Sequence, residues 1–323
     1  MADIDGKLGI VGIGNWGWNH LSTQAEIAGE QNIIVADLEG DRLEEARKRF
    51  PDVETTGDVE ALFERPEVGA VTIATPAPTH ADLAPRALLA GKDVLVEKPI
   101  TLSSDEGEKL TELADREDAI LMVGHLLLYQ QALDVIRNAI HNGAIGKIQS
   151  LHQVRRKLGT VRENENVLWS FGVHDLAVFL DLIGEPPGRV EAHGFAKHQE
   201  SVEDDVHVDL EFPEDVHAHL HTSWIWPETE RRLTVIGTDG VLRYDELQGQ
   251  VTLFDQGIEE DLSTFERGQE ILAEVDDEPL TREIEHFLDC ISRRETPRSD
   301  GQNGVQVIEI LEQADNQLEA SSA

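Results

Sequence analysis

A glycine-rich turn between a short apolar run and a helix-like segment constrains the fold most strongly. Gly12-Ile13-Gly14-Asn15-Trp16-Gly17 follows the run Leu8–Val11 and opens the periodic segment Trp16–Ala28. Glycines at this spacing allow a tight turn, close approach of backbone to phosphate, and close packing of helix on strand. The N-terminus of the helix adds free N–H groups and a partial positive charge. The turn therefore predicts a dinucleotide site that includes Gly12, Gly14, Asn15, Trp16 and Gly17.

An aspartate stands where such a site needs a carboxylate. Asp37 ends the next apolar run, Ile33–Asp37, and lies 20 residues after Gly17. A carboxylate at this place accepts hydrogen bonds from the adenosine ribose and repels a 2′-phosphate. The sequence therefore predicts NAD rather than NADP as the cofactor.

The rest of the first half repeats the alternation of short strands and helices. The expected strands are Leu8–Val11, Ile33–Asp37, Ala70–Ala74, Asp93–Val96 and Ile120–Val123, and the expected helices are Trp16–Ala28, Asp41–Phe50 with Asp41 as N-cap, Pro78–Ala90 and Ser103–Arg116. Apolar strands that alternate with helices are typical of a parallel sheet buried on both faces. We expect an α/β fold with an N-terminal Rossmann domain over residues 1–125.

Three further residues follow the strand Ala70–Ala74. Ligands of an open α/β sheet bind outside the carboxyl ends of its strands, where Thr75 and Pro76 lie. His80 follows one helical turn later. We expect Thr75, Pro76 and His80 to line the cofactor groove, with a surface helix position as the alternative for His80.

The second half has a different pattern. Turn residues separate longer alternating segments, which we expect to be strands: Lys147–Val154, Gly188–Lys197, Val206–Phe212, Val216–Trp226, Arg231–Gly237 and Val251–Phe254. Such alternation is typical of an antiparallel sheet with one solvated or ligand-facing side. Helices are expected at Asp175–Leu182, Thr281–Ser292 and Val305–Leu318. We expect an α+β domain over residues 126–323 that binds substrate and mediates oligomerisation.

The charge balance limits the partners. The 64 acidic and 27 basic residues give a formal charge of −37, and the acidic residues are dispersed along the chain. This surface is typical of a protein from a high-salt cytoplasm, where counterions screen self-repulsion. It disfavours nucleic-acid binding. There is no apolar stretch long enough to span a membrane and no signal-like N-terminus, so we expect a cytoplasmic protein. Cys290 is the only cysteine, which excludes an intrachain disulfide.

Several motifs together resemble one enzyme family. The glycine turn, Thr75-Pro76, Glu97-Lys98-Pro99 and Gly172-Val173-His174-Asp175 are similar to motifs of the glucose–fructose oxidoreductase/inositol dehydrogenase/MocA (Gfo/Idh/MocA) family. The resemblance covers nearly the whole chain. It implies a Rossmann domain followed by a domain with an open, mostly antiparallel sheet, a catalytic lysine at Lys98, a place for Glu97 in the cofactor site, and a homo-oligomer.

A narrower resemblance concerns the substrate. Asn15–His20, Val123–His125 with Tyr129, Asn166–Asp175, and Ser223-Trp224 with Arg231-Arg232 look like the UDP-N-acetylglucosamine 3-dehydrogenase branch. It implies oxidation of a secondary hydroxyl, at C3 of a UDP-N-acetylhexosamine. The chain departs from the family at Ser170, where many members carry an aspartate four residues before the histidine. Asp175 follows the histidine directly, and on a helix its side chain would point about 100° away from that of His174.

Oxidation of a secondary alcohol needs a base for the hydroxyl proton. We expect His174 to take that proton, because histidine titrates near neutral pH. Lys98 would then stabilise the negative charge that develops on the oxygen. The reverse assignment, with Lys98 as the base, stays open.

The remaining candidate residues concern the substrate. Arginines suit bidentate phosphate binding, so we expect Arg155 and Arg162 from the basic cluster of residues 155–162 to hold a diphosphate, with surface salt bridges as the alternative. His125, Tyr129, Trp169 and Ser170 are further expected substrate contacts, and core packing is the alternative for the first three.

The histidines of one expected strand bear on metal binding. His217, His219 and His221 alternate and so share one face of a strand, with Val216, Ala218, Leu220 and Trp224 expected in the core. Such an array is able to bind zinc. We nevertheless predict no metal site, because the expected chemistry needs none.

Two other functions compete with the predicted one. A free-sugar or cyclitol dehydrogenase would use the same residues on a smaller substrate. A non-catalytic NAD-binding sensor would keep the cofactor site alone, and the presence of both Lys98 and His174 speaks against it.

Overall fold

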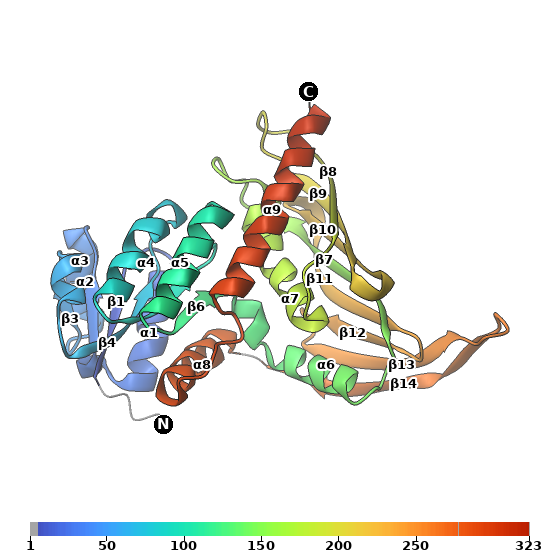
Figure 1. Ribbon diagram of the computed structural model, residues 1–323, viewed down its shortest axis with the longest axis horizontal. Helices are drawn as coiled ribbons and strands as arrows, with labels where there is room; N and C mark the ends of the chain where they lie inside the picture. The colour runs from blue at the N-terminus through green and yellow to red at the C-terminus, as the bar shows by residue number, and fades with distance from the viewer. Residues whose placement is uncertain (1–5, 277, 323) are drawn as a thin grey trace. The chain divides into compact units, whose positions relative to one another are not determined.

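The computed structural model describes residues 6–276 and 278–322 (Figure 1). The chain forms two compact units, Met1–Leu126 with Glu278–Ile308, and Leu127–Asp277 with Glu309–Ala323. The first break between the two units lies after Leu126. The segment Glu278–Ile308 belongs to the first unit instead of the second, because α8 (Pro279–Arg293) packs against α1 (Gly17–Ala28).

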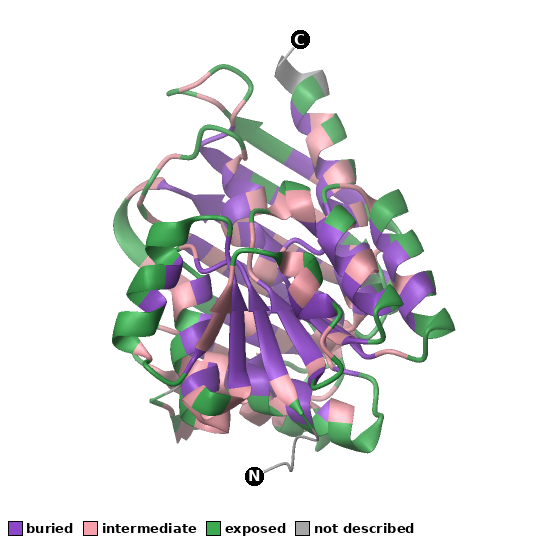
Figure 2. Ribbon diagram, turned by 90° about the vertical axis from the view of Figure 1, so that its left-hand side faces the viewer, coloured by how far each residue is buried: buried purple, intermediate pink, exposed green. Residues whose placement is uncertain are grey.

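The first unit is built on a six-stranded parallel sheet. Its order is β3-β2-β1-β4-β5-β6, with β1 Lys7–Val11, β2 Ile33–Ala36, β3 Glu54–Thr56, β4 Val68–Ile73, β5 Asp93–Glu97 and β6 Leu121–Gly124. The helices of this unit are α1, α2 (Gly40–Arg49), α3 (Val59–Phe63), α4 (His80–Leu89), α5 (Ser104–Arg116) and α8. Figure 2 shows the strands buried between helices whose outer faces are exposed. This is the predicted Rossmann architecture.

Three elements of the first unit differ locally from the prediction. The helix expected to begin after an Asp41 N-cap begins instead at Gly40, with Glu39 at the N-cap position. The segment Pro78–Ala90 is divided into the 3-10 turn η2 (Ala77–Thr79) and α4. β3 was not predicted, because its sequence Glu-Thr-Thr has no apolar residue and it lies at the edge of the sheet.

The second unit is built on an eight-stranded sheet in the order β14-β13-β12-β11-β7-β10-β9-β8. The strands are β7 Ile148–Leu158, β8 Arg189–Phe195, β9 Asp205–Phe212, β10 Val216–Ser223, β11 Ile225–Gly237, β12 Val241–Asp245, β13 Gln250–Ile258 and β14 Thr264–Glu274. Every neighbouring pair is antiparallel except β7 and β10. The prediction of a mostly antiparallel sheet is confirmed.

One face of this sheet forms the core of the second unit. The helices of the unit are α6 (Gln131–His141) and α7 (Val173–Ile183), with a π-helical turn η4 at Leu168–Gly172 directly before α7. Val216, Ala218 and Leu220 of β10 are buried as predicted, and Leu220 contacts the η4 turn. The histidines between them therefore lie on the opposite face.

The last helix, α9 (Gly301–Ser322), runs through the point at Ile308 where the chain passes from the first unit to the second. Among the described residues, no helix combines the length and apolar character that a membrane span requires.

Candidate active site

The glycine turn of the first unit has no room for side chains at two positions. Gly12 has a φ of +85°, and a Cβ atom there would lie 2.6 Å from Cγ2 of Thr75. A Cβ on Gly17 would lie 2.1 Å from the carbonyl oxygen of Gly12. At Gly14, in contrast, an added Cβ would meet nothing within 4 Å. The turn is thus packed against Thr75, in the segment after β4, and open at Gly14, where a ligand can approach the backbone.

This open side faces a cavity of about 680 Å³. Six of the predicted cofactor residues line it: Gly12, Gly14, Asn15, Asp37, Thr75 and Pro76. They come from the carboxyl ends of β1, β2 and β4, where an open parallel sheet binds its ligand. The volume is within the range of small-molecule sites, so this cavity is the candidate cofactor site.

Asp37 is held in place by backbone groups. Its Oδ2 accepts a hydrogen bond from Ile13 N at 2.8 Å, and its Oδ1 accepts one from Glu39 N at 2.8 Å. Arg42 Nη1 lies 3.4 Å from Oδ2, and the Arg42 side chain is 49% exposed. The carboxylate is therefore fixed at the rim of the cavity while the guanidinium beside it can turn away.

Glu97, at the end of β5, ties the helix α1 to the residue that follows it. Its carboxylate accepts hydrogen bonds from the Trp16 indole, from His20 Nε2 at 2.7 Å, and from the backbone N–H of Lys98 at 3.1 Å. Burial alone would raise the pKa of Glu97, but the bond from His20 and the positive charges of His20 and Lys98 lower it below its usual value. Glu97 and Trp16, predicted to contact the cofactor, thus bond each other, and we assign Glu97 to holding Lys98.

Lys98 is half-buried directly after β5, at the carboxyl edge of the sheet. His125 follows the neighbouring strand β6 and is 1% exposed. Burial and then the charge of Lys98 lower the pKa of His125 to about 3. The His125 ring is therefore neutral near pH 7, next to the charged Lys98.

His80 lies in neither of the two positions expected for it. It is fully buried, and its Nδ1 lies 2.8 Å from the carbonyl oxygen of Pro99 while its Nε2 lies 2.9 Å from that of Thr75. Both ring nitrogens are used by the protein, so the predicted cofactor contact is replaced by a structural one. His80 clamps the loop after β4 to the loop that carries Lys98.

In the second unit, His174 lies in the first turn of α7, and Ser170 lies in the η4 turn before it. The two residues are four apart, so they share one face of the helix. π-Helical turns occur frequently at functional sites, because they redirect the side chains around them. Ser170 is 9% exposed.

Trp169 and Tyr129, both predicted to contact the substrate, are held by other parts of the second unit. The Trp169 indole donates to Asp315 Oδ2 at 2.6 Å, and Asn166 Nδ2 donates to Asp315 Oδ1 at 2.9 Å. Tyr129 is only 2% exposed. Asp315, from α9, was not predicted, because nothing in its local sequence distinguishes it from other helix-surface acids.

The predicted basic cluster does not assemble on one face. Arg155 is 9% exposed and donates to Asp175 and Glu246 in the interior. Arg156 lies on the other face of β7 and donates to Glu230 Oε2 at 2.7 Å. Arg162 is 57% exposed, with Glu165 at 3.7 Å. The expected diphosphate contact of Arg155 is therefore replaced by buried ion pairs.

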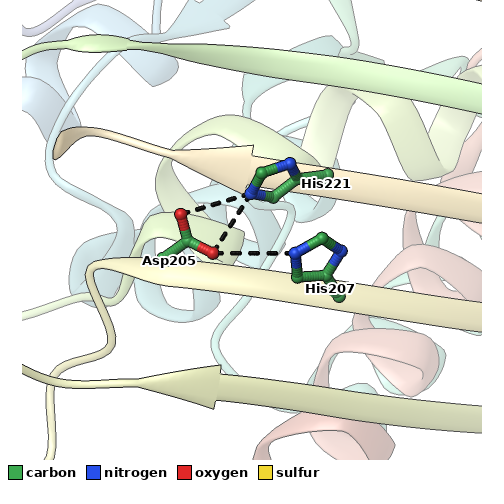
Figure 3. Close-up of side chains that lie close together, drawn as sticks. All are labelled: Asp205, His207 and His221. Atoms are coloured by element: carbon green, nitrogen blue, oxygen red, sulfur yellow. Dashed lines mark hydrogen bonds and ion pairs between the residues drawn. The ribbon is translucent and has the colours of Figure 1, made fainter. Parts of the chain in front are cut away.

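Histidines of the outer sheet face bond to separate carboxylates. His217 lies 3.3 Å from Asp215, His219 lies 2.5 Å from Asp209, and His221 lies 3.1 Å from Asp205. Within the described ranges, one group comes close enough together to hold a metal ion, and Figure 3 shows it: Asp205, His207 and His221.

Arg156 argues against a metal at this group. Its Nη1 lies 2.8 Å from Nδ1 of His221 and can only donate, so Nδ1 accepts. The proton of a neutral His221 ring is then on Nε2, the nitrogen that faces Asp205. A metal ligand needs that lone pair free, so Arg156 would have to leave before His221 could coordinate.

Comparisons with known proteins place the chain in a family. Residues 7–125 match the family model described as "Oxidoreductase family, NAD-binding Rossmann fold", and residues 134–243 match the GFO/IDH/MocA C-terminal domain.

Three relatives illustrate the range of that family. UDP-N-acetylglucosamine 3-dehydrogenase from Acidithiobacillus ferrooxidans is 27% identical over 94% of both chains, and its solved structure matches 98% of this chain and 99% of its own with a TM-score of 0.87 at 26% identity. The scyllo-inositol 2-dehydrogenase (NAD(+)) of Bacillus subtilis is 25% identical over 90% of this chain and 87% of its own. An NADP(+)-dependent scyllo-inositol 2-dehydrogenase of the same organism is 28% identical over 72% of this chain and 67% of its own. With both of its parts matched in order, this chain belongs to the GFO/IDH/MocA family of oxidoreductases.

Proposed function

We propose that this protein is an NAD-dependent dehydrogenase that oxidises a secondary hydroxyl of a sugar, C3 of a UDP-N-acetylhexosamine. The observation that carries the proposal lies in the first unit, where Glu97 holds the backbone of Lys98 at the carboxyl edge of the sheet that forms the cofactor cavity. The similarity to the UDP-N-acetylglucosamine 3-dehydrogenase over 94% of both chains supports the choice of substrate.

NAD supplies the hydride acceptor when it is bound. Asp37 fits the ribose hydroxyls of NAD, because its carboxylate is fixed at the rim of the cavity. The backbone at Gly14 leaves room for the pyrophosphate. Arg42 beside Asp37 is the residue that would favour a 2′-phosphate, but its bond to Asp37 reduces that attraction.

The chain's own residues then move the proton. In this proposal His174 removes the proton of the substrate hydroxyl, and Lys98 donates a hydrogen bond to the same oxygen while its negative charge develops. The mechanism requires both side chains to reach one substrate oxygen. His174 is preferred to His125 as the base, because burial and the charge of Lys98 lower the pKa of His125 to about 3.

A cyclitol dehydrogenase is the second candidate. The cyclitol activity is favoured because Arg155 donates hydrogen bonds to Asp175 and Glu246, so one residue expected to bind the diphosphate is already occupied. It is also the activity named for the Bacillus subtilis relatives. The exposed Arg162 is still a candidate cation for a diphosphate.

The test is a substrate panel in concentrated KCl. The protein is mixed with NAD and, in turn, UDP-N-acetylglucosamine, UDP-N-acetylgalactosamine, glucose, myo-inositol and scyllo-inositol, and NADH is followed by its absorbance. We expect turnover with a UDP-sugar. Turnover with cyclitols alone would support the second candidate, and NAD binding without turnover of any compound would indicate a sensor.

We further propose a cytoplasmic homo-oligomer adapted to high salt. The formal charge of −37 supports adaptation to high salt, and the outer face of the eight-stranded sheet is the proposed contact surface. Light scattering across a range of KCl concentrations tests both points. A monomer at every salt concentration would contradict the oligomer.

A further inference from the structure

Four charged side chains form a connected chain inside the second unit. Arg155 Nε donates to Asp175 Oδ1 and Oδ2 at 3.0 and 2.9 Å, and Arg155 Nη2 donates to Glu246 Oε2 at 2.8 Å. Arg231 Nη1 donates to Glu246 Oε1 at 2.9 Å. We call this chain of Asp175, Arg155, Glu246 and Arg231 the buried bridge.

Stability alone does not explain the buried bridge. The Asp175 side chain is 1% exposed, and those of Arg155 and Glu246 are 10% and 12% exposed. Burial raises the pKa of Asp175 to about 6, although the charge of Arg155 and its hydrogen bonds oppose the shift. Buried ion pairs contribute little net stability compared with apolar residues of similar volume. A role in holding the connected elements in a fixed geometry is therefore considered for the buried bridge.

The buried bridge joins four places in the second unit. Arg155 belongs to β7, Asp175 to the first turn of α7, Glu246 to the turn after β12, and Arg231 to β11. The guanidinium of Arg155 reaches Asp175 with one edge and Glu246 with the other. A lysine could not make both contacts, because it lacks this planar fork.

The residue next to Asp175 is His174. Adjacent residues of a helix point about 100° apart, so fixing the carboxylate of Asp175 on Arg155 fixes the rotation of the whole first turn. The turn before it is the π-helical segment Leu168–Gly172. Arg155 thus adds a polar constraint from the sheet to the packing of the buried Val173 and Leu176.

We propose that Asp175 is a positioning residue, which acts through Arg155 and Glu246 to set the direction in which His174 leaves α7. The inference deepens the proposed function, because it matters for catalysis only if His174 acts on the substrate. It assigns Arg155 a role in the geometry of the active histidine rather than in binding phosphate.

The first measurement does not depend on activity. The ring signals of His174 are recorded by NMR in the whole protein and assigned by their loss in His174→Gln. In Asp175→Asn we expect the His174 signals to move, because the bridge has lost its charge. The matched control is Glu230→Gln, which breaks the neighbouring ion pair of Arg156 on the other face of β7. It should move the signals of His221, which Arg156 contacts, and leave those of His174 in place.

The second measurement is kinetic, with UDP-N-acetylglucosamine as the first probe. Asp175→Asn should lower kcat about tenfold, because small misplacements of a catalytic group cost up to about a hundredfold. The KM for NAD should stay the same, because the cofactor cavity belongs to the first unit. Glu246→Gln, one link further along the bridge, should act in the same direction but less, and it serves as the test if Asp175→Asn does not fold.

A double-mutant cycle separates positioning from stability. Because Asp175 acts through His174, Asp175→Asn should cause no further loss of kcat in a His174→Ala background. A full additional loss there, or unchanged His174 signals in Asp175→Asn, would overturn the inference. Absence of turnover by the wild-type protein with every sugar would instead contradict the proposed function, and the NMR result would still decide whether Asp175 positions His174.

Discussion

His80 and Pro99 are joined by a hydrogen bond that connects the start of α4 to the loop of the proposed catalytic lysine. Nδ1 of His80 lies 2.8 Å from the carbonyl oxygen of Pro99, one residue after Lys98. The other ring nitrogen lies 2.9 Å from the carbonyl oxygen of Thr75, which lines the cofactor cavity. One buried ring therefore sets the spacing of two loops that the proposed reaction uses.

Replacing His80 by leucine should lower both the stability of the protein and its kcat. Leucine removes the ring N–H that donates to one of these carbonyl groups, and leaving a buried carbonyl without its donor costs about 1–3 kcal/mol. Unfolding by urea in concentrated KCl measures the loss of stability, and kcat per folded molecule measures the loss of order in the Lys98 loop. Leu89→Gln, at the exposed end of α4, is the control. A His80→Leu protein as stable as that control would show that the clamp is unimportant.

Loss of either proposed catalytic group should affect turnover and not cofactor binding. Lys98→Ala and His174→Ala should each lower kcat about 10²–10⁴-fold, the range typical of positioned proton-transfer groups. The dissociation constant of NAD, measured by fluorescence titration, should change little. The pH profile distinguishes their roles: if His174 is the base, the acid limb of kcat disappears in His174→Ala and persists in Lys98→Ala. Near-wild-type turnover by either variant would remove that residue from the mechanism.

Glu283, on α8, should make the stability of the protein fall as the pH rises. It is fully buried, and neither carboxylate oxygen has a hydrogen-bond partner among the described residues. Burial, and then the charge of Glu97, raise its pKa well above the usual value. A group whose pKa is higher in the folded than in the unfolded state stabilises the folded protein while the pH lies below the unfolded-state pKa. That contribution to the free energy of unfolding is lost as the pH rises through the folded-state pKa.

The comparison that isolates Glu283 is the slope of stability against pH. In Glu283→Gln, the free energy of unfolding should fall less than in the wild type between about pH 5 and about pH 8, because the titrating group is gone. Glu285→Gln changes an exposed acid of the same helix and should keep the wild-type slope. Equal slopes in Glu283→Gln and wild type would mean that Glu283 is already ionised in the folded protein.

Asp37 should determine the preference between the two dinucleotides. Asp37→Ala should weaken NAD binding about 10- to 100-fold, the range expected when a charged hydrogen-bond partner is lost. The dissociation constants of NAD and NADP should then differ less than in the wild type. Arg42→Gln should weaken NADP binding and leave NAD binding nearly unchanged, because Arg42 is the cation beside that carboxylate. Titration of both variants with both cofactors checks this. Stronger NADP than NAD binding in the wild type would contradict the assignment.

Much of the first unit could be predicted because its signals are local. The glycine turn, the apolar strands and Asp37 each depend on neighbouring residues, and the structure brings Gly12, Asp37 and Thr75 to one cavity. Strands without that signal were missed. β14 has mostly exposed residues, and β3 is short and polar, so neither shows apolar alternation.

The interior charges could not be predicted in the same way. Adjacent residues of a strand point to opposite faces, and so Arg155 and Arg156 separate although the sequence suggests a cluster. Which of the two enters the interior depends on Asp175 and Glu246, which are 20 and 91 residues away. The burial of Glu283 likewise depends on the packing of α8 against α1, which no local pattern reveals.

The pKa of about 3 at His125 limits the paths that a released proton can take. A ring that stays neutral across the working range cannot store a proton, even for the time of one turnover. His125, which follows β6, is thus not expected to hold the proton that the substrate releases. In the proposed oxidation the proton must therefore leave by a route other than the imidazole of His125.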